Sequence, residues 1–471
     1  MLVGMSLALL AVSACNTSDT PSGSVTPGIT GAALTKAPEK TPTEAPVKAT
    51  GAPEKTPTEA PAKTPTGTPD AEAKPATDEE LFEYVIAKWK QGKAGELYEY
   101  ADASLAAILD RDGFAYLFDS VSDIGGALNG VTDKKSGTAN GITTYTAKLD
   151  FEYITANLAI SFADSKLCSF NRNVYFKDTF EIDRGDGRME RYFVLENDGH
   201  RLNAVYTYVN DGKPHPAVLL IAGSGPGDYN ETVGLLTPFE DIALGLAENG
   251  INSLRVDKRT LNYASDFGIT SGMEQEYGSD CNAAIEFLKK ENISGLYLLG
   301  HSLGGQIAAE LADGNGDIDG MILFNSSARH LADIACDQYT RLDSANKAAY
   351  LAHAAAAKAA VADTAQGAYY YNASDYYWAS YNQLDTIKSV KDAGIKTLII
   401  NSRFDNQIFD ADIELWESHL SDNENVAIRV FDDISHFGYK IDTTDSLSVY
   451  RRVDFPEELI RTFSDFVREM P

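Results

Sequence analysis

The chain has little of several residue types whose abundance would narrow its function. Its 471 residues include four cysteines, three tryptophans and seven histidines, and only 40 lysines and arginines stand against 69 aspartates and glutamates. The formal net charge of −29 argues against a nucleic-acid partner, because nucleic-acid binding needs clustered positive charge. It also argues against adhesion to an anionic membrane by charge.

The number and spacing of the cysteines argue against a disulfide-rich scaffold and against a zinc-bound one. Cys15 ends an apolar stretch, which leaves Cys168, Cys281 and Cys336, an odd number without metal-like spacing. Neither a disulfide framework nor a zinc site is therefore predicted, and we expect buried thiols. The composition, 44% hydrophobic and 23% charged, is that of an ordinary globular protein, and the length suffices for two or three domains.

The N-terminus resembles a secretion signal. Residues 1–14 are almost entirely apolar or small, and this run is too short for a permanent transmembrane helix. It ends in Val12-Ser-Ala-Cys15, which resembles the lipobox of bacterial lipoproteins. The resemblance implies that residues 1–15 are a lipoprotein signal and that Cys15 is lipidated. The protein is then expected to be extracytoplasmic, attached to the cell membrane only through this lipid.

Residues 16–77 are rich in Thr, Pro, Lys and Glu and contain few large apolar side chains. A ten-residue sequence that begins at Ala37 recurs at Ala52. Such a segment cannot bury enough apolar surface to fold, and its prolines keep it extended. We expect a disordered tether between the anchor and the folded part.

Residues 78–177 change from a helical pattern to a strand pattern. Apolar residues such as Leu81, Val85 and Trp89 recur at helical spacing up to about residue 120. Strand patterns with intervening turns follow. They cover Ile142–Phe151, Ala156–Phe162 and Leu167–Phe176. This order resembles the NTF2-like fold, which implies a small α+β domain, and its lack of clustered catalytic residue types favours a packing or substrate-gating role.

From residue 178 short apolar strands alternate with helical segments, which predicts a mostly parallel sheet with its site at the carboxyl ends of the strands. The clearest signal is Gly300-His-Ser-Leu-Gly304, between an apolar strand and a helix-prone segment. A serine at such a turn has strained dihedral angles, so its flanking positions must be small. Ser302 is the candidate nucleophile; a glycine-rich loop before a helix is the alternative.

A serine hydroxyl needs a base to accept its proton and a carboxylate to orient that base. In hydrolases with this turn, the acid and then the histidine follow the serine along the chain. Asp405 lies in the loop after the predicted strand 395–400, and His436 lies in the loop after the predicted strand 426–431. We therefore expect Asp405 to be the acid and His436 the base.

Four other residues are weaker candidates for these roles. His419 belongs to a predicted amphipathic helix and should be a surface or packing residue. His301 stands beside the nucleophile, and that position in the turn directs its side chain elsewhere. Asp432 and Asp433 lie too close in sequence to the expected base to be preferred as its acid.

A glycine-rich loop precedes the serine turn by one strand–helix–strand unit. The predicted strand 216–222 opens into Gly223-Ser-Gly-Pro-Gly227, whose glycines allow backbone N–H groups to turn inward. The loop could instead cradle a phosphate, although it lacks the lysine of a P-loop. We expect the N–H groups of Ser224 and Leu303 to form an oxyanion hole. The Asp257-Lys-Arg259 run should brace a loop and is given no catalytic role.

Between residues 328 and 393 the alternation of strands and helices is interrupted by a segment rich first in alanine and then in tyrosine. We predict a helical cap over the strand ends, which would exclude water from the site. If its aromatic side chains line the pocket, they favour apolar or aryl acyl groups.

Together these residues resemble an α/β-hydrolase, and more narrowly a bacterial esterase group that pairs a Gly-Ser-Gly-Pro loop with an N-terminal domain of unknown function. Thr260 and Asn401 depart from that group, which usually has glycine at both positions. The positions that match are Gly223–Pro226, Leu254–Arg259, Gly300–Gly305, Tyr377-Trp378, Arg403–Asp405 and His436.

The resemblance implies a hydrolase domain over residues 178–471 that cleaves small carboxylic esters through an acyl-enzyme. The expected enzyme is a serine carboxylesterase that needs neither a metal nor an organic cofactor. Peptide or thioester cleavage would use the same machinery. A surface-binding lipoprotein with a degenerate hydrolase domain is the alternative from a different class.

Overall fold

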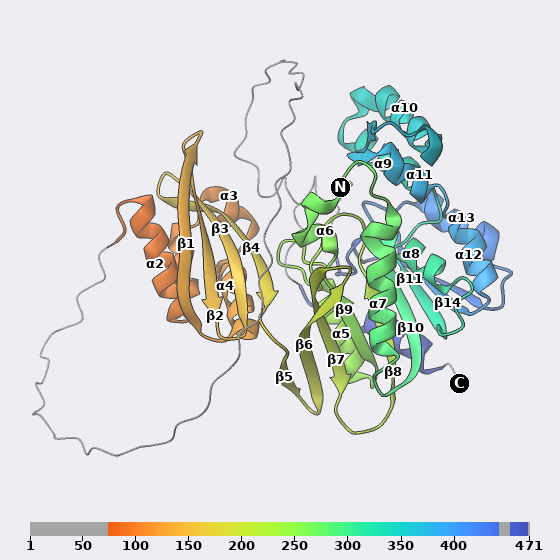
Figure 1. The fold of residues 1–471 in the computed structure, drawn as a ribbon, viewed down its shortest axis with the longest axis horizontal. Helices are drawn as coiled ribbons and strands as arrows, with labels where there is room; N and C mark the ends of the chain where they lie inside the picture. Colours follow the sequence, from red (N-terminus) through yellow and green to blue (C-terminus); the bar gives the residue numbers. More distant parts are fainter. Residues whose placement is uncertain (1–73, 442–452, 470–471) are drawn as a thin grey trace, which may run out of the picture. The chain divides into compact units, whose positions relative to one another are not determined.

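The computed structural model describes residues 74–441 and 453–469 (Figure 1). The predicted signal, its Cys15 and the tether up to residue 73 lie outside the described residues. Within those described ranges, every helix is too short or too polar to cross a lipid bilayer.

Four helical segments and an antiparallel sheet come first along the described chain. Thr77 caps the first helix by accepting a hydrogen bond from the Glu80 N–H, 3.2 Å away. In the third strand every second residue from Ile154 to Phe162 is buried, because successive side chains of a strand point to opposite faces. The elements, with the strands paired in this order, are α2 (Asp78–Lys90), η1 (Ala94–Tyr100), α3 (Ala103–Ile108), α4 (Arg111–Gly125), β1 (Leu128–Ala139), β2 (Ile142–Phe151), β3 (Ile154–Ala163) and β4 (Lys166–Phe176).

A nine-stranded sheet follows, in the order β15-β14-β11-β10-β8-β9-β7-β6-β5 (Figure 1). The six strands from β15 to β9 are parallel, and β7, β6 and β5 continue the sheet antiparallel. This mostly parallel arrangement confirms the predicted α/β-hydrolase fold. The strands are β5 (Phe180–Gly185), β6 (Arg188–Asn197), β7 (His200–Val209), β8 (His215–Ile221), β9 (Asn252–Val256), β10 (Ile293–His301), β11 (Gly320–Phe324), β14 (Lys396–Ser402) and β15 (Val426–Phe431).

Helices cover both faces of this sheet. In β10, Leu296 and Leu298 belong to the core that includes α7, α8 and α13, whereas Tyr297 and Leu299 pack with α5 and α14 on the other face. This alternation explains why the strand is a continuous apolar run, since both faces are buried. The helical segments are α5 (Pro238–Glu248), α6 (Arg259–Asn262), η2 (Ala264–Asp266), η3 (Glu274–Gly278), α7 (Ser279–Leu288), α8 (Leu303–Ala312), α13 (Asp410–Leu420) and α14 (Glu457–Arg468).

The predicted cap lies between β11 and β14 and is mainly helical, with one short hairpin. Trp378 is fully buried, and its indole N–H donates to the Tyr370 carbonyl, 2.8 Å away. Tyr371 and Tyr381 are also buried. The aromatic residues therefore form much of the cap's own core. Its elements are α9 (Leu331–Leu342), η4 (Ser344–Asn346), α10 (Lys347–Lys358), η5 (Ala362–Thr364), β12 (Tyr369–Tyr370), β13 (Ala373–Ser374), α11 (Asp375–Tyr381) and α12 (Thr386–Ala393).

Candidate active site

Ser302 occupies a sharp turn between β10 and α8. Its φ of 54° and ψ of −122° are strained for a residue with a side chain. A Cβ on Gly300 would lie 2.1 Å from the Gly304 carbonyl oxygen, and a Cβ on Gly304 would lie 2.1 Å from the Ile221 carbonyl oxygen. Both positions therefore require glycine, and the turn holds the serine clear of the sheet.

Asp405 and His436 meet at the carboxyl ends of β14 and β15. Asp405 Oδ2 lies 2.7 Å from His436 Nδ1, and both residues are buried. Asp405 Oδ1 accepts hydrogen bonds from the backbone N–H groups of Gln407 and Ile408, at 2.7 and 2.9 Å. Because the carboxylate accepts the proton on Nδ1, Nε2 is left as the proton acceptor of the ring.

The loop that carries His436 also contacts the residue next to Ser302. The carbonyl oxygen of His436 accepts from His301 Nε2 at 2.9 Å and from Asn325 Nδ2 at 2.8 Å. Among the hydrogen bonds that the described residues make, none joins the Ser302 hydroxyl to the His436 ring.

The weaker candidates occupy other positions. Both ring nitrogens of His301 are engaged, since Nδ1 lies 2.9 Å from Glu231 Oε1 and Nε2 contacts the backbone of the base loop. Burial opposes protonation of His301, but the Glu231 carboxylate outweighs it and raises the pKa of the ring above its ordinary value. His419 is exposed on α13. Asp432 and Asp433 are exposed and pair with surface cations.

Ser302, Ser224 and Leu303 line one small cavity of about 20 Å³. Within the described part of the chain, neither the Ser224 nor the Leu303 backbone N–H has a hydrogen-bond acceptor. Leu303 is the first residue of α8, where N–H groups have no partner within the helix. Two free donors thus lie beside the serine, as an oxyanion hole requires.

The remaining wall of this cavity is mostly aliphatic and amidic. The cap contributes Leu331, Ile334, Ala335 and Gln338, all from α9. Gln306 on α8 and three loop residues, Ser327, Gln407 and Ile408, also line it. No tyrosine or tryptophan of the cap lines this cavity, so the condition for a preference for aryl acyl groups is not met. The aromatic side chains are used to pack the cap itself.

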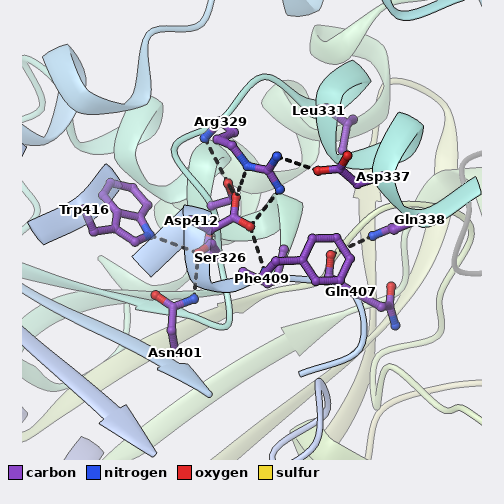
Figure 2. A network of polar contacts seen from close by, with 12 residues as sticks. Ser326, Arg329, Leu331, Asp337, Gln338, Asn401, Gln407, Phe409, Asp412 and Trp416 are labelled. Atoms are coloured by element: carbon purple, nitrogen blue, oxygen red, sulfur yellow. Dashed lines mark hydrogen bonds and ion pairs between the residues drawn. The ribbon is translucent and has the colours of Figure 1, made fainter. Parts of the chain in front are cut away.

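Figure 2 shows how the loops after β11 and β14 are joined. The Ser326 carbonyl accepts from the Asn401 amide at 2.9 Å and from the Trp416 indole at 3.0 Å. Asp412 on α13 accepts from Arg329 Nε at 2.7 Å and from Arg329 Nη2 at 2.9 Å. Asn401 is fully buried near the end of β14, so its amide connects this strand to the segment after β11.

The sequence analysis did not identify Glu231 or Tyr277, and it assigned Lys258 only to loop bracing. All three contact Gly223, the first residue of the glycine-rich loop. Glu231 and Tyr277 lie in segments without any recognised motif. Only the Asp257-Lys-Arg259 run pointed toward this cluster.

The three cysteines in the described ranges form no disulfide; Cys168 and Cys336 are buried and Cys281 is partly buried. Burial raises the pKa of the Cys281 thiol to about 12, so it stays protonated at neutral pH. Within the described ranges, no group of His, Cys, Asp and Glu residues is arranged to hold a metal ion.

No protein-family profile matches the sequence. The esterase EstD of Thermotoga maritima is 34% identical over 226 residues, which are 47% of this chain and 54% of EstD. The chain thus spans about half the length of that curated relative. Among solved structures, Est1E from Butyrivibrio proteoclasticus aligns with a TM-score of 0.41 at 15% identity, over 59% of this chain and 99% of Est1E. Proline iminopeptidase from Mycobacterium smegmatis aligns with a TM-score of 0.40 at 17% identity, over 59% and 98%.

Proposed function

We propose that residues 178–471 form a serine hydrolase that cleaves carboxylic esters. The observation that carries the proposal is the 2.7 Å contact between Asp405 and His436, at the same edge of the sheet as the strained Ser302 turn. β10, β14 and β15 are parallel members of one sheet, so the residues that follow them emerge at the same edge. The identity with EstD supports an ester as the bond that is cleaved.

In the proposed reaction, Ser302 Oγ attacks the ester carbonyl carbon while His436 Nε2 accepts the hydroxyl proton. Asp405 stabilises the imidazolium that results. The N–H groups of Ser224 and Leu303 donate to the oxyanion of the tetrahedral intermediate. His436 then gives the proton to the leaving alcohol, and the acyl group remains on the serine. Water, deprotonated by the same histidine, releases the acid and regenerates the enzyme.

The cavity beside Ser302 favours short acyl groups. Its volume of about 20 Å³ is close to what one water molecule needs. Leu331, Ile334 and Ala335 close it on the cap side. A longer chain would have to displace these side chains, so we propose acetyl and similarly small esters as the preferred substrates.

The N-terminal signal extends the proposal to the place of action. Val12-Ser-Ala-Cys15 and the Pro-rich segment after it support a lipid-anchored, extracytoplasmic enzyme. This part rests on the sequence alone. Metabolic labelling with a fatty-acid analogue tests it: label should enter the wild type and be absent from Cys15→Ala.

Active-site labelling of the full chain tests the enzymatic proposal. A fluorophosphonate probe should label the wild type and Ser418→Ala, an exposed serine variant on α13, but not Ser302→Ala. p-Nitrophenyl esters from acetate to octanoate should be cleaved most rapidly at the short end. Asp405→Asn should lower kcat by about a thousandfold, since the imidazole loses its orienting carboxylate.

Other outcomes would contradict the proposal in different ways. A wild type that is neither labelled nor hydrolytic would be a binding protein. Faster turnover of peptides or thioesters than of esters would agree with Ser302 as the nucleophile but would contradict an ester as the preferred substrate. Preference for octanoate would contradict the short acyl site.

A further inference from the structure

Two buried side chains hold the carbonyl oxygen of Gly223. Lys258 Nζ donates to it at 2.9 Å, and the Tyr277 hydroxyl donates to it at 2.6 Å. Both side chains are almost inaccessible, with 6% and 3% of their surface exposed. A buried ammonium group is unfavourable unless its donors are satisfied. Lys258 uses its other two on Glu276 Oε1 at 2.6 Å and on the Tyr277 oxygen at 2.7 Å.

The held carbonyl belongs to the same peptide group as the Ser224 N–H. A trans peptide is planar, so its C=O and N–H point in opposite directions. No cis peptide occurs among the described residues. Hydrogen bonds that fix the Gly223 oxygen on one side therefore fix the direction of the Ser224 N–H on the other. The preceding peptide is held as well, because the Gly223 N–H donates to Glu231 Oε1 at 2.7 Å.

This peptide lies directly against the nucleophile. A Cβ on Gly223 would lie 3.0 Å from Ser302 Cβ. Ser224 also lines the cavity at Ser302, and its N–H has no acceptor among the described residues. Contacts that fix the direction of this N–H therefore fix it relative to Ser302.

Tyr277, which holds the carbonyl, and Glu276, which pairs with Lys258, come from an unusual turn. Glu276 and Tyr277 lie in the π-helical segment Glu274–Gly278, just before α7. Such turns are rare and occur frequently at functional sites. The cap reaches the same place, since burial and the nearby Glu276 carboxylate raise the pKa of the Tyr377 hydroxyl. The cluster thus joins the segment after β9 to the π turn, with the cap beside it.

We propose that Lys258 and Tyr277 are positioning residues that direct the Ser224 N–H into the oxyanion hole. This inference rests on the proposed hydrolase function. Neither residue touches the reacting atoms; both act through the Gly223–Ser224 peptide. Their effect should appear in the transition state, where the oxyanion exists, rather than in the binding of substrate.

The experiment compares Tyr277→Phe and Lys258→Met with Tyr206→Phe. Tyr206 is a matched control, because it is equally buried and its hydroxyl accepts a hydrogen bond from Asn252 at 2.9 Å, away from the loop. Removal of an oxyanion donor lowers kcat by two to three orders of magnitude, so a misdirected donor should cost about tenfold in Tyr277→Phe and about a hundredfold in Lys258→Met. KM should stay nearly constant, and Tyr206→Phe should retain wild-type kcat.

A second measurement uses a trifluoromethyl ketone, which adds to the serine and carries the oxyanion in its bound form. Its inhibition constant should rise in each variant by the factor by which kcat/KM falls. Thermal unfolding of every variant establishes whether it is folded. If Lys258→Met does not fold, because Glu276 is left buried without its cation, Tyr277→Phe alone decides the inference.

Folded variants with wild-type kcat and ketone affinity would overturn the positioning role while Ser302→Ala remains inactive. A loss confined to KM would overturn it too. A wild type that neither hydrolyses esters nor binds the ketone would refute the proposed function instead.

Discussion

The turn at Ser302 and the loop at Ser224 face the same cavity but are held by different means. The turn is held by its own backbone: carbonyl groups fill the space that side chains would need at Gly300 and Gly304. The glycine-rich loop is held by the side chains of Glu231, Lys258 and Tyr277, which bind both peptide groups at Gly223.

This difference has a general consequence. A turn maintained by steric exclusion depends on residues within a few positions of itself, so its sequence is diagnostic. A loop maintained by hydrogen bonds depends on residues that are far away in sequence, such as Tyr277, 54 positions from Gly223. In the proposed reaction both regions place a group beside the substrate carbonyl. The Ser302 turn does so through neighbouring residues, and the Ser224 loop through residues that are distant in the chain.

The largest expected effect tests steric exclusion. Gly304→Ala should destabilise the protein by about 3 kcal/mol or more, or prevent folding, because the new methyl group meets the Ile221 carbonyl in a packed interior. Gly227→Ala, in the glycine-rich loop, should cost less than about 1 kcal/mol, because nothing lies within 4 Å of its Cβ position. Urea denaturation measures both. Equal losses of unfolding free energy in the two variants would contradict the distinction between the turn and the loop.

The next effect tests the side-chain support of the loop and depends on pH. The pKa of His301 is raised in the folded state by Glu231, so their attraction stabilises the protein fully below the ordinary histidine value of 6.5 and is lost as pH rises through the raised value. Glu231→Gln should therefore cost about 2 kcal/mol near pH 5 and less near pH 9.

Denaturation at the two pH values measures this difference. Glu310→Gln is the control, because among the described residues its carboxylate accepts only from the Ser389 hydroxyl, at 3.2 Å, and should show no such dependence. A cost for Glu231→Gln that grows toward alkaline pH would have the wrong sign and would refute the attraction.

The smallest effect extends the comparison to the loop that carries Asp405. Asn401→Ala should cost about 1–2 kcal/mol, since it leaves the buried Ser326 carbonyl with one donor fewer. Asn425→Ala removes an equivalent side chain–backbone hydrogen bond at an exposed position, 3.0 Å from the Gly394 carbonyl, and should cost less than about 0.5 kcal/mol. Equal melting temperatures for the two variants would show that burial does not strengthen this connection.

Much of the fold could be predicted because its signals are local. β2 and β15 have the predicted bounds, 142–151 and 426–431, since the strand pattern is complete within each. The first strand, β1, was not predicted because Leu128–Ala139 is mostly exposed and polar, so no alternation of apolar residues marks it. β1 is held in place by its backbone pairing with β2 rather than by burial of its side chains.

The candidate site also has features that the sequence predicts and features that it does not. Ser302, Asp405 and His436 each follow a predicted strand, so their shared edge of the sheet was foreseeable. The 2.7 Å contact between Asp405 and His436 was not, because it depends on how two loops close. Whether the aromatic cap residues line the cavity or pack the cap was left open, since composition does not reveal which face of a helix packs inward.

By itself, the sequence determined the apolar strands and the strained serine turn, because each depends on near neighbours in the chain. It also placed Ser302, Asp405 and His436 directly after predicted strands. Only the tertiary structure decided the direction of the Ser224 N–H, the size of the cavity and the partners of Gly223. Those features arise where segments as distant in the chain as Ser224, Tyr277 and Ile408 pack together, and hydrogen bonds across such distances leave no periodic pattern in a sequence.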